Sequence, residues 1–223
     1  MDWVSEIVDP ERRMALAYAP RDRRQALALL WALDERLGAI VAATREAMLG
    51  EIRLAWWRDA LAALEGGAPG GEPLLESLLE IRRDRQLSSA ELARLPEGWT
   101  ALLGALPLDR EALVRHGEER GSVLFKLAGN LLGSRGAGLD DAGAAWALTD
   151  LAARISDRST AEAARLLAAE RLARIADIRW AKPLRPLAVL TALARQDGRT
   201  SAPRRQGSPR RLVAALWSGI TGR

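Results

Sequence analysis

The sequence predicts an all-α protein built as a single helical bundle. Apolar residues recur at intervals of three and four along most of the 223 residues, as at Leu30, Leu33 and Leu37, which is the spacing of one helix face. No alternation of apolar and polar residues is long enough to predict a β-strand. Helices that each carry one apolar face bury those faces against one another, so a bundle is the expected architecture.

The predicted helices are separated by breaks that glycine, proline and capping residues mark. A glycine-rich run at 66–71 ends the second helix, Asp109 and Ser159 are suited to cap later helices, and the glycines of 133–138 separate two more. The helices are expected at residues 21–45, 48–65, 72–83, 88–95, 109–119, 120–134, 139–157, 160–178, 184–196 and 208–219.

We expect residues 1–223 to form one domain, because the chain is long enough to bury a substantial core. No uncharged apolar run reaches about 18 residues, so no membrane-spanning helix is expected. Residues 1–6 have neither a basic start nor an apolar core, which argues against a secretory signal. These features favour a cytoplasmic protein, or one that lies peripherally on the inner face of the membrane.

The residue inventory excludes several kinds of chemistry. The chain has no cysteine, which removes disulfides, thiol nucleophiles and zinc–thiolate sites. Its one histidine, His116, is too few for a histidine metal site and has no visible partner for acid–base catalysis. Because Gly117, Glu118 and Glu119 follow it, His116 is expected on a polar helix surface.

The C-terminal part combines a basic segment with an apolar one. Residues 198–211 are rich in Arg, Pro, Ser and Gly, which predicts an exposed basic loop. The net charge is +4, but the arginines are spread among acids, so nucleic-acid binding is not favoured. The apolar residues 212–217 that follow predict either a terminal helix packed on the bundle or a helix that contacts an anionic membrane surface.

Two adjacent tryptophans, Trp56 and Trp57, lie within the helix predicted at 48–65. The chain has eight Trp but one Tyr and one Phe, so these positions do not reflect a general richness in aromatic residues. Neighbouring residues point about 100° apart on a helix, and the two indoles cannot share one narrow seam. Either this helix is buried on a wide face, or one indole lies against something other than the core.

The tryptophan pair belongs to a set of segments that resembles the squalene/phytoene synthase family. The chain is most similar to the bacterial branch related to a mitochondrial complex I assembly factor. The strongest feature is the run Gly50-Glu51-Ile52-Arg53-Leu54-Ala55-Trp56-Trp57-Arg58-Asp59. The other matching segments are residues 18–20, 23–27 and 30–33, and more weakly 119–133, 142–157 and 185–187.

The resemblance implies an all-α isoprenoid synthase fold. Active members of the family join two isoprenoid diphosphates head to head, and two Asp-rich helix motifs hold Mg²⁺ across a cavity. Ionising an allylic diphosphate requires divalent charge on the leaving oxygens, and Mg²⁺ prefers carboxylate ligands. An Asp-x-x-x-Asp pair places two carboxylates on one helix face for this purpose.

Both metal motifs are depleted in this chain. In the first, Asp34 and Glu35 are present, but the residue four positions after Asp34 is Gly38. Asp34 is expected either beside a cavity or as a solvated charge at the edge of the apolar face. In the second, Asp150 and Asp157 are seven residues apart on the predicted helix, with Arg154 between them on the same face. Arg154 would neutralise both acids and compete with a metal ion.

Two functions follow from these expectations. The first is a non-catalytic protein with depleted motifs and no cofactor, which binds an isoprenoid or lipid, a partner protein or a membrane surface. The alternative is an active Mg²⁺-dependent prenyl transferase in which an arginine assists with the phosphate charge. The candidate diphosphate and cavity residues are Asp34, Glu35, Arg53, Arg58, Asp150 and Asp157, with Asp34, Asp150 and Asp157 as the metal ligands.

Overall fold

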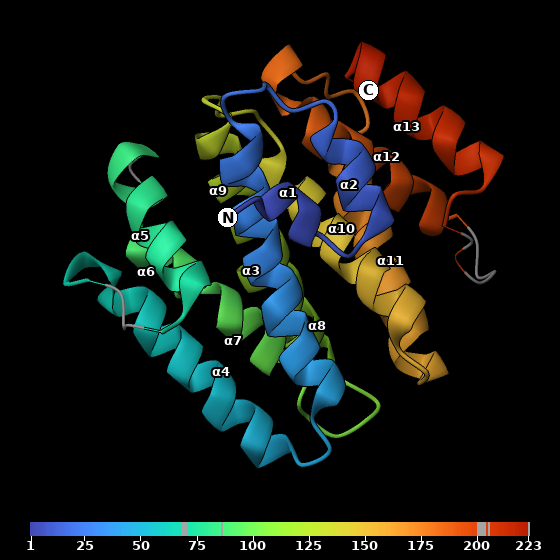
Figure 1. The fold of residues 1–223 in the computed structure, drawn as a ribbon. Helices are drawn as coiled ribbons and strands as arrows, with labels where there is room; N and C mark the ends of the chain where they lie inside the picture. The colour runs from blue at the N-terminus through green and yellow to red at the C-terminus, as the bar shows by residue number, and fades with distance from the viewer. Residues whose placement is uncertain (68–70, 86, 200–203, 205, 223) are drawn as a thin grey trace.

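The computed structural model describes residues 1–67, 71–85, 87–199, 204 and 206–222 and is shown in Figure 1. These residues form helices and connecting loops without a strand, so the all-α prediction is confirmed. No helix within the described ranges is long and apolar enough to cross a membrane.

The α-helices range from four to twenty residues, and several of the predicted helices are divided into shorter pieces. The α-helices are α1 (Trp3–Glu6), α2 (Pro10–Leu16), α3 (Arg24–Ala43), α4 (Ala47–Ala62), α5 (Pro73–Arg85), α6 (Ser89–Leu92), α7 (Leu95–Thr100), α8 (Arg110–Arg115), α9 (Val123–Leu131), α10 (Leu139–Arg154), α11 (Arg158–Arg174), α12 (Arg185–Asp197) and α13 (Pro209–Thr221). Single-turn 3₁₀ helices span Ala63–Glu65 and Lys182–Leu184, and a π-helical segment, His116–Ser122, joins α8 to α9.

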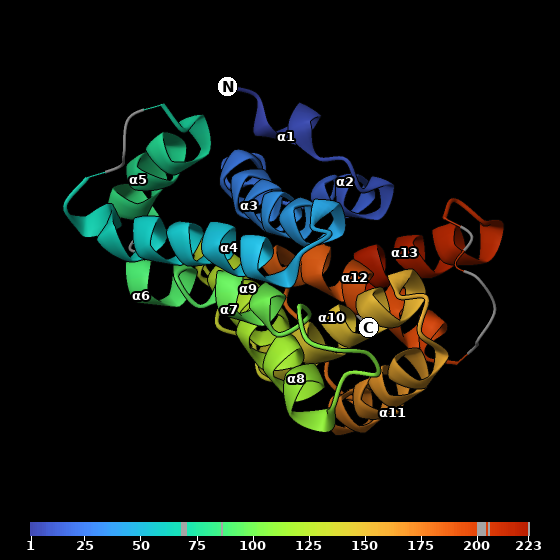
Figure 2. The same cartoon turned by 90° about the horizontal axis from the view of Figure 1, so that it is seen from below.

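Two long helices, α3 and α10, organise the bundle. Helices α4 and α5 lie on one side of α3, whereas α11, α12 and α13 lie on the side of α10, as Figures 1 and 2 show. Twelve of the sixteen residues of α10 are buried, because it packs against the π-helical segment, α9, α11 and α12. Trp146 and Ala147 face the larger core cluster, and Leu148 and Leu151 face a smaller one shared with α11.

Capping residues explain where several helices begin. Asp109 accepts a hydrogen bond from the backbone amide of Ala112 and caps α8, as predicted. The predicted cap at Ser159 is wrong, because the chain leaves the helical conformation at Ile155 and the Asp157 carboxylate accepts from the amide of Thr160 to start α11. The break at 133–138 is confirmed.

Only one indole of the tryptophan pair belongs to the core. Trp57 is 5% exposed and lies on the buried face of α4 with Leu54 and Leu61, whereas Trp56 is 48% exposed. The two rings meet edge to face, with their centroids 5.3 Å apart. The wide buried face is therefore not observed, and Trp56 lies on the outer surface.

The C-terminal segment packs more closely than the sequence predicted. Residues 209–211 begin α13 rather than continuing a loop, and Arg211 is buried in ion pairs with Glu11 of α2 and Asp197 of α12. Arg204 is largely buried too, beside Asp197 at 2.8 Å. The expectation of an exposed basic loop at 198–211 is therefore wrong at these two arginines, and its residues 200–203 and 205 lie outside the described part of the chain.

The closest helix crossing joins the π-helical segment to α10. At this crossing Gly121 and Gly143 face each other, and a Cβ atom built on either glycine would lie 2.1 Å from the carbonyl oxygen of the other. Gly121 and Gly143 therefore allow the two backbones to pack in direct contact.

We predict that Gly143→Ala lowers the free energy of unfolding by about 3 kcal/mol or prevents folding, because the added methyl group must push two backbones apart. Urea denaturation followed by circular dichroism measures this loss. Gly66→Ala is the matched control, because its Cβ would meet its nearest atom at an ordinary 3.6 Å. Equal stability of the two variants would contradict the tight crossing.

Candidate functional site

The two acidic residues of the depleted motifs meet at the centre of the molecule. Asp34 of α3 is completely buried, and Asp150 of α10 is 4% exposed. A single nitrogen, Nη2 of Arg120, donates to one carboxylate oxygen of each, at 3.1 Å in both cases. The two carboxylates therefore face each other, but a guanidinium group fills the space between them.

Arg120 comes from the π-helical segment and is 2% exposed. Its Nε atom donates to Oδ1 of Asp34 at 3.0 Å, which makes the pair with Asp34 bidentate. Its guanidinium carbon lies 4.0 Å from the ring centroid of Trp99 and 4.7 Å from that of Trp146. Two indoles and two carboxylates thus hold this arginine, so its position is fixed on all sides.

Two further side chains donate hydrogen bonds to the carboxylate of Asp34. Arg12 of α2 donates to its Oδ2 atom and also to the backbone carbonyl of Trp31 at 2.9 Å. The indole nitrogen of Trp99 donates to Oδ1 at 2.8 Å. Both oxygens of this carboxylate therefore carry at least two hydrogen bonds.

Asp150 is enclosed in the same way. Arg154, one turn later on α10, donates to its Oδ1 atom at 2.9 Å, and Arg204 donates to the same oxygen at 3.0 Å. The predicted neutralisation of Asp150 by Arg154 is confirmed, although the second partner of Arg154 is Asp9 rather than Asp157. We call the six residues Arg12, Asp34, Arg120, Asp150, Arg154 and Arg204 the central ion-pair cluster.

The arginines keep both carboxylates charged despite their burial. Burial alone disfavours the charged form, but the adjacent Arg120 and Arg12 outweigh it and lower the pKa of Asp34 to about 2. Arg120, Arg204 and Arg154 likewise outweigh the burial of Asp150 and hold its pKa far below the ordinary aspartate value. The two acids are therefore ionised ligands of arginine throughout the physiological pH range.

His116 lies beside this cluster and is completely buried, so the predicted polar surface position is wrong. Its Nδ1–H group donates to the carbonyl of Gly98 at 2.7 Å, and its Nε2 atom faces Nη1 of Arg120 at 3.3 Å. Burial and the charge of Arg120 lower the pKa of His116 to about 4. A neutral imidazole accepts from the arginine, whereas a protonated one would repel it.

The missing second carboxylate of the first motif has a steric reason. A Cβ atom added to Gly38 would lie 2.7 Å from the indole of Trp99, the same indole that donates to Asp34. The ring therefore occupies the volume that an acidic side chain at position 38 would need. Gly38 and Trp99 fit each other as a pair.

These residues do not fit a Mg²⁺ site. A magnesium ion needs carboxylate oxygens that are free to coordinate it, and here every oxygen of Asp34 and Asp150 accepts from an arginine. Four guanidinium groups would also oppose a divalent cation. Within the described residues, no group of three or more His, Asp and Glu side chains is arranged to hold a metal ion.

The other acidic candidates have structural contacts instead. Glu35 accepts from the backbone amides of Val8 and Asp9, at 2.9 and 3.2 Å, and so fixes the connection between α1 and α2. Asp157 lies beyond the end of α10 and caps α11. The expectation that Asp150 and Asp157 share one helix face is wrong, because α10 ends between them.

The two arginine candidates lie on the outer surface of α4. Arg53 is exposed. Arg58 pairs with Asp59 at 3.0 Å and with Glu97 at 3.2 Å. Neither is among the residues that contact Asp34 or Asp150, so the structure does not bring them together with the two acids.

Sequence reasoning missed Arg12, Arg120, Trp99 and Arg204 as partners of the two acids. Arg120 carried a weak signal, since it is a charged residue at the start of the otherwise apolar and small run Gly121-Ser122-Val123-Leu124. The others carried none, because they come from elements far apart in the chain.

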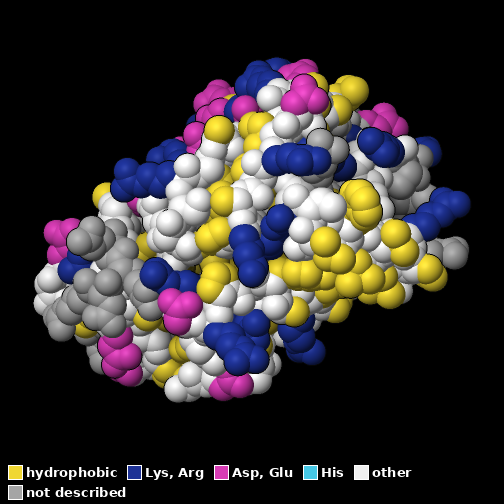
Figure 3. Space-filling model, turned by 90° about the horizontal axis from the view of Figure 1, so that it is seen from above, with side chains coloured by type: hydrophobic (Ala, Val, Ile, Leu, Met, Phe, Trp, Pro, Cys, Tyr) yellow, Lys and Arg dark blue, Asp and Glu magenta, His cyan; other side chains and the backbone are white. Residues whose placement is uncertain are grey.

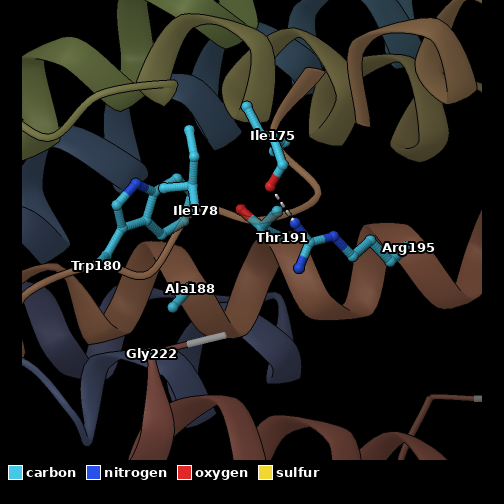
Figure 4. Close-up of a pocket in the computed structure, with 7 residues that line it drawn as sticks. All are labelled: Ile175, Ile178, Trp180, Ala188, Thr191, Arg195 and Gly222. Atoms are coloured by element: carbon cyan, nitrogen blue, oxygen red, sulfur yellow. Dashed lines mark hydrogen bonds between the residues drawn. The ribbon is translucent and has the colours of Figure 1, made fainter. Parts of the chain in front are cut away.

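A small pocket elsewhere has no room for an organic ligand. Figure 4 shows it between α12 and the loop after α11, lined by residues that include Trp180, Thr191 and Arg195. Arg195 donates to the carbonyl of Ile175 at 2.8 Å, and Thr191 donates to that of Leu187 at 2.8 Å. With a volume of about 10 Å³, the pocket has space for about one water molecule.

We predict that Arg120→Met lowers the free energy of unfolding by about 3 to 5 kcal/mol, because it leaves two buried carboxylates short of a partner. Urea denaturation measures the loss. Arg154→Met is the control: it removes another partner of Asp150, but its side chain is 59% exposed, and a loss of about 1 kcal/mol or less is expected. Equal losses would contradict a central role for Arg120.

We predict that the His116 ring stays neutral down to about pH 4, which NMR can follow without overlap because the chain has one histidine. An unfolded chain protonates this ring near pH 6.5, so it binds a proton that the folded chain lacks between these values. The free energy of unfolding should therefore fall by about 3 kcal/mol as the pH decreases from about 6.5 to 4. His116→Gln should lose this slope; an unchanged slope would contradict the assignment.

Comparisons with known proteins agree with this architecture. A search of curated sequences finds no match. A crystal structure of a dehydrosqualene synthase in complex with a ligand is similar, with a TM-score of 0.70 and 14% identity, over 98% of this chain and 94% of that one. This likeness shows that the two share the all-α isoprenoid synthase fold. The sequence profile described as squalene/phytoene synthase matches residues 7–210, and the chain therefore belongs to the squalene/phytoene synthase family.

Proposed function

We propose that this chain is a non-catalytic member of its family, which acts by binding rather than by joining prenyl diphosphates. The observation that carries the proposal is the position of Arg120, which bonds to both Asp34 and Asp150 where the family chemistry requires metal ions. The guanidinium group of Arg120 here neutralises the two carboxylates, which Mg²⁺ would neutralise in an active member of the family.

The electrostatic balance supports this proposal. Replacing the arginines by Mg²⁺ would require breaking several charge-assisted hydrogen bonds in a buried site and rehydrating or re-pairing each guanidinium group. Catalysis by this family also needs a pair of carboxylates within one motif. The second carboxylate of the first motif would stand at position 38, and the indole of Trp99 fills the space that its side chain would need. The arginine contacts and the indole of Trp99 both disfavour metal binding at these carboxylates.

The outer surface supports a binding role. Two helices show large apolar side chains to the outside: α4 with Met48, Leu49, Ile52 and Trp56, and α13 with five more. Exposed apolar faces of this kind are typical of surfaces that contact a protein, a lipid or a membrane. We propose that the chain works at the cytoplasmic face of the membrane, where an assembly factor or a lipid-binding protein meets its partners.

The proposal predicts that the folded protein releases no pyrophosphate above background when incubated with Mg²⁺ and farnesyl or geranylgeranyl diphosphate, because the two metal motifs are held by arginines. A coupled pyrophosphate assay, together with extraction of apolar products, measures this. An active dehydrosqualene synthase serves as the positive control.

Turnover that Asp34→Asn abolishes and Asp59→Asn leaves intact would contradict the proposal and favour the active prenyl transferase. Asp59 is the matched control because it is an exposed carboxylate on α4 that pairs with Arg58. Circular dichroism of each variant shows whether the loss comes from unfolding.

A further inference from the structure

Helix α13 is oriented opposite to an ordinary surface helix. Its buried side consists of Arg211, Ala215, Ser218 and Gly219, whereas its large apolar side chains point outward. These outward residues are 42% to 71% exposed: Leu212, Val213, Leu216, Trp217 and Ile220. A surface helix of a globular protein normally does the reverse, because burial of apolar side chains is what holds it in place. We call these five residues the α13 apolar face.

Specific contacts fix this orientation. Arg211 forms buried ion pairs with Glu11 at 2.6 Å and with Asp197. At the other end, a Cβ atom added to Gly219 would lie 2.2 Å from the ring of Tyr18, so the helix approaches that ring as closely as glycine allows. The helix cannot turn its apolar face inward without breaking the ion pairs and pressing larger side chains against Tyr18.

The α13 apolar face is continuous. Figure 3 shows a band of hydrophobic side chains along this part of the surface, with Lys and Arg side chains around it. Beside the band lies an open, mostly apolar groove of about 510 Å³, lined by residues that include Arg210, Val213 and Trp217. A continuous exposed apolar surface of this kind marks a contact site.

The charges around the face identify the kind of partner. Helix α13 contains no Asp or Glu, and Arg210 lies on the same side as Val213 and Trp217. Near its other end, the backbone amide of Trp180 donates to the carbonyl of Gly222, which brings exposed Arg179 and Lys182 close to the end of the helix. Arg179, Lys182 and Arg210 take part in no ion pair with any residue that the structure describes; the ion pairs in this region are those of Arg204 and Arg211.

Arg199, at the end of α12, adds a fourth exposed cation. The acids nearest to this group in sequence are Asp177 and Asp197. Asp197 is already paired with Arg204 and Arg211. The segment 177–182 keeps a net charge of +1 with Asp177, Arg179 and Lys182 included. A partner for this surface must accept an apolar helix face with a tryptophan and must carry negative charge at both ends of it.

We propose that α13 lies in the plane of an anionic lipid membrane, with its apolar face in the boundary between headgroups and acyl chains. Trp217 is suited to this boundary, and the flanking cations are suited to anionic headgroups. The inference rests on the proposed binding role and names the partner of one surface. Helix α4 offers no such signal, because acidic Glu51 and Asp59 accompany Arg53 and Arg58 along it.

The test is sedimentation of the full chain with vesicles of phosphatidylcholine containing phosphatidylglycerol, compared with phosphatidylcholine alone. The anionic vesicles should bind the protein at least about tenfold more strongly, and raising the salt concentration should weaken this binding. Val213→Ser combined with Trp217→Ser should lower the partition coefficient at least about tenfold. Circular dichroism should show that this double variant is folded, because both replaced side chains are exposed.

The matched control is Ile52→Ser combined with Trp56→Ser, which removes a similar apolar area from α4 and should leave binding unchanged. Trp217→Phe should keep the binding but lose much of the tryptophan quenching by brominated lipids. Three results overturn the inference: no binding of the folded chain to anionic vesicles, equal loss in the α4 variant, or a dimer in lipid-free solution that the α13 variant dissociates.

These outcomes are distinct from those of the prenyl transfer assay. Vesicle binding is measured without diphosphate substrate or Mg²⁺, so a chain that fails to bind vesicles and shows no turnover overturns the inference about α13 and leaves the proposed loss of catalysis standing. Turnover together with vesicle binding overturns only the proposed loss of catalysis.

Discussion

The structure depends on one buried interaction, in which the guanidinium group of Arg120 joins the carboxylates of Asp34 and Asp150. Without this cation between them, two buried acids on facing helices would repel each other and would be unstable in the core. Its position in turn requires the indoles of Trp99 and Trp146 on its two faces. The packing of the π-helical segment against α10 brings Arg120 to this position.

From this centre, alternating charges extend to the C-terminal helix. Asp150 pairs with Arg204, Arg204 with Asp197, and Asp197 with Arg211, which returns to Glu11 beside Arg12. Buried ion pairs contribute little net stability compared with apolar packing, but they specify which groups must meet. Here they fix the C-terminal segment onto α2, and this fixes which face of α13 points outward. The central cluster and the outer apolar face are thus parts of one arrangement.

Under the proposed function, the fold of the family is retained and its chemistry is lost. The match to the squalene/phytoene synthase family extends over nearly the whole chain. It includes the run at 50–59, in which Trp57 is buried in the core. Arginine and tryptophan side chains contact the carboxylates of Asp34 and Asp150, the acids of the two motifs. A shared fold sets where side chains meet, whereas the identity of those side chains decides whether a reaction takes place there.

The sequence by itself determined the helical class, most helix positions, the family and the depletion of both acidic motifs, because periodicity, turn residues and short motifs are local properties. It also indicated that Arg154 would neutralise Asp150, since residues four apart on a helix are neighbours. Only the tertiary structure placed Arg12, Arg120 and Trp99 around Asp34, as these come from elements separated by up to 86 positions along the chain. It likewise placed His116 in the core and turned the apolar side of α13 outward, because both depend on which surfaces the ion pairs bring together.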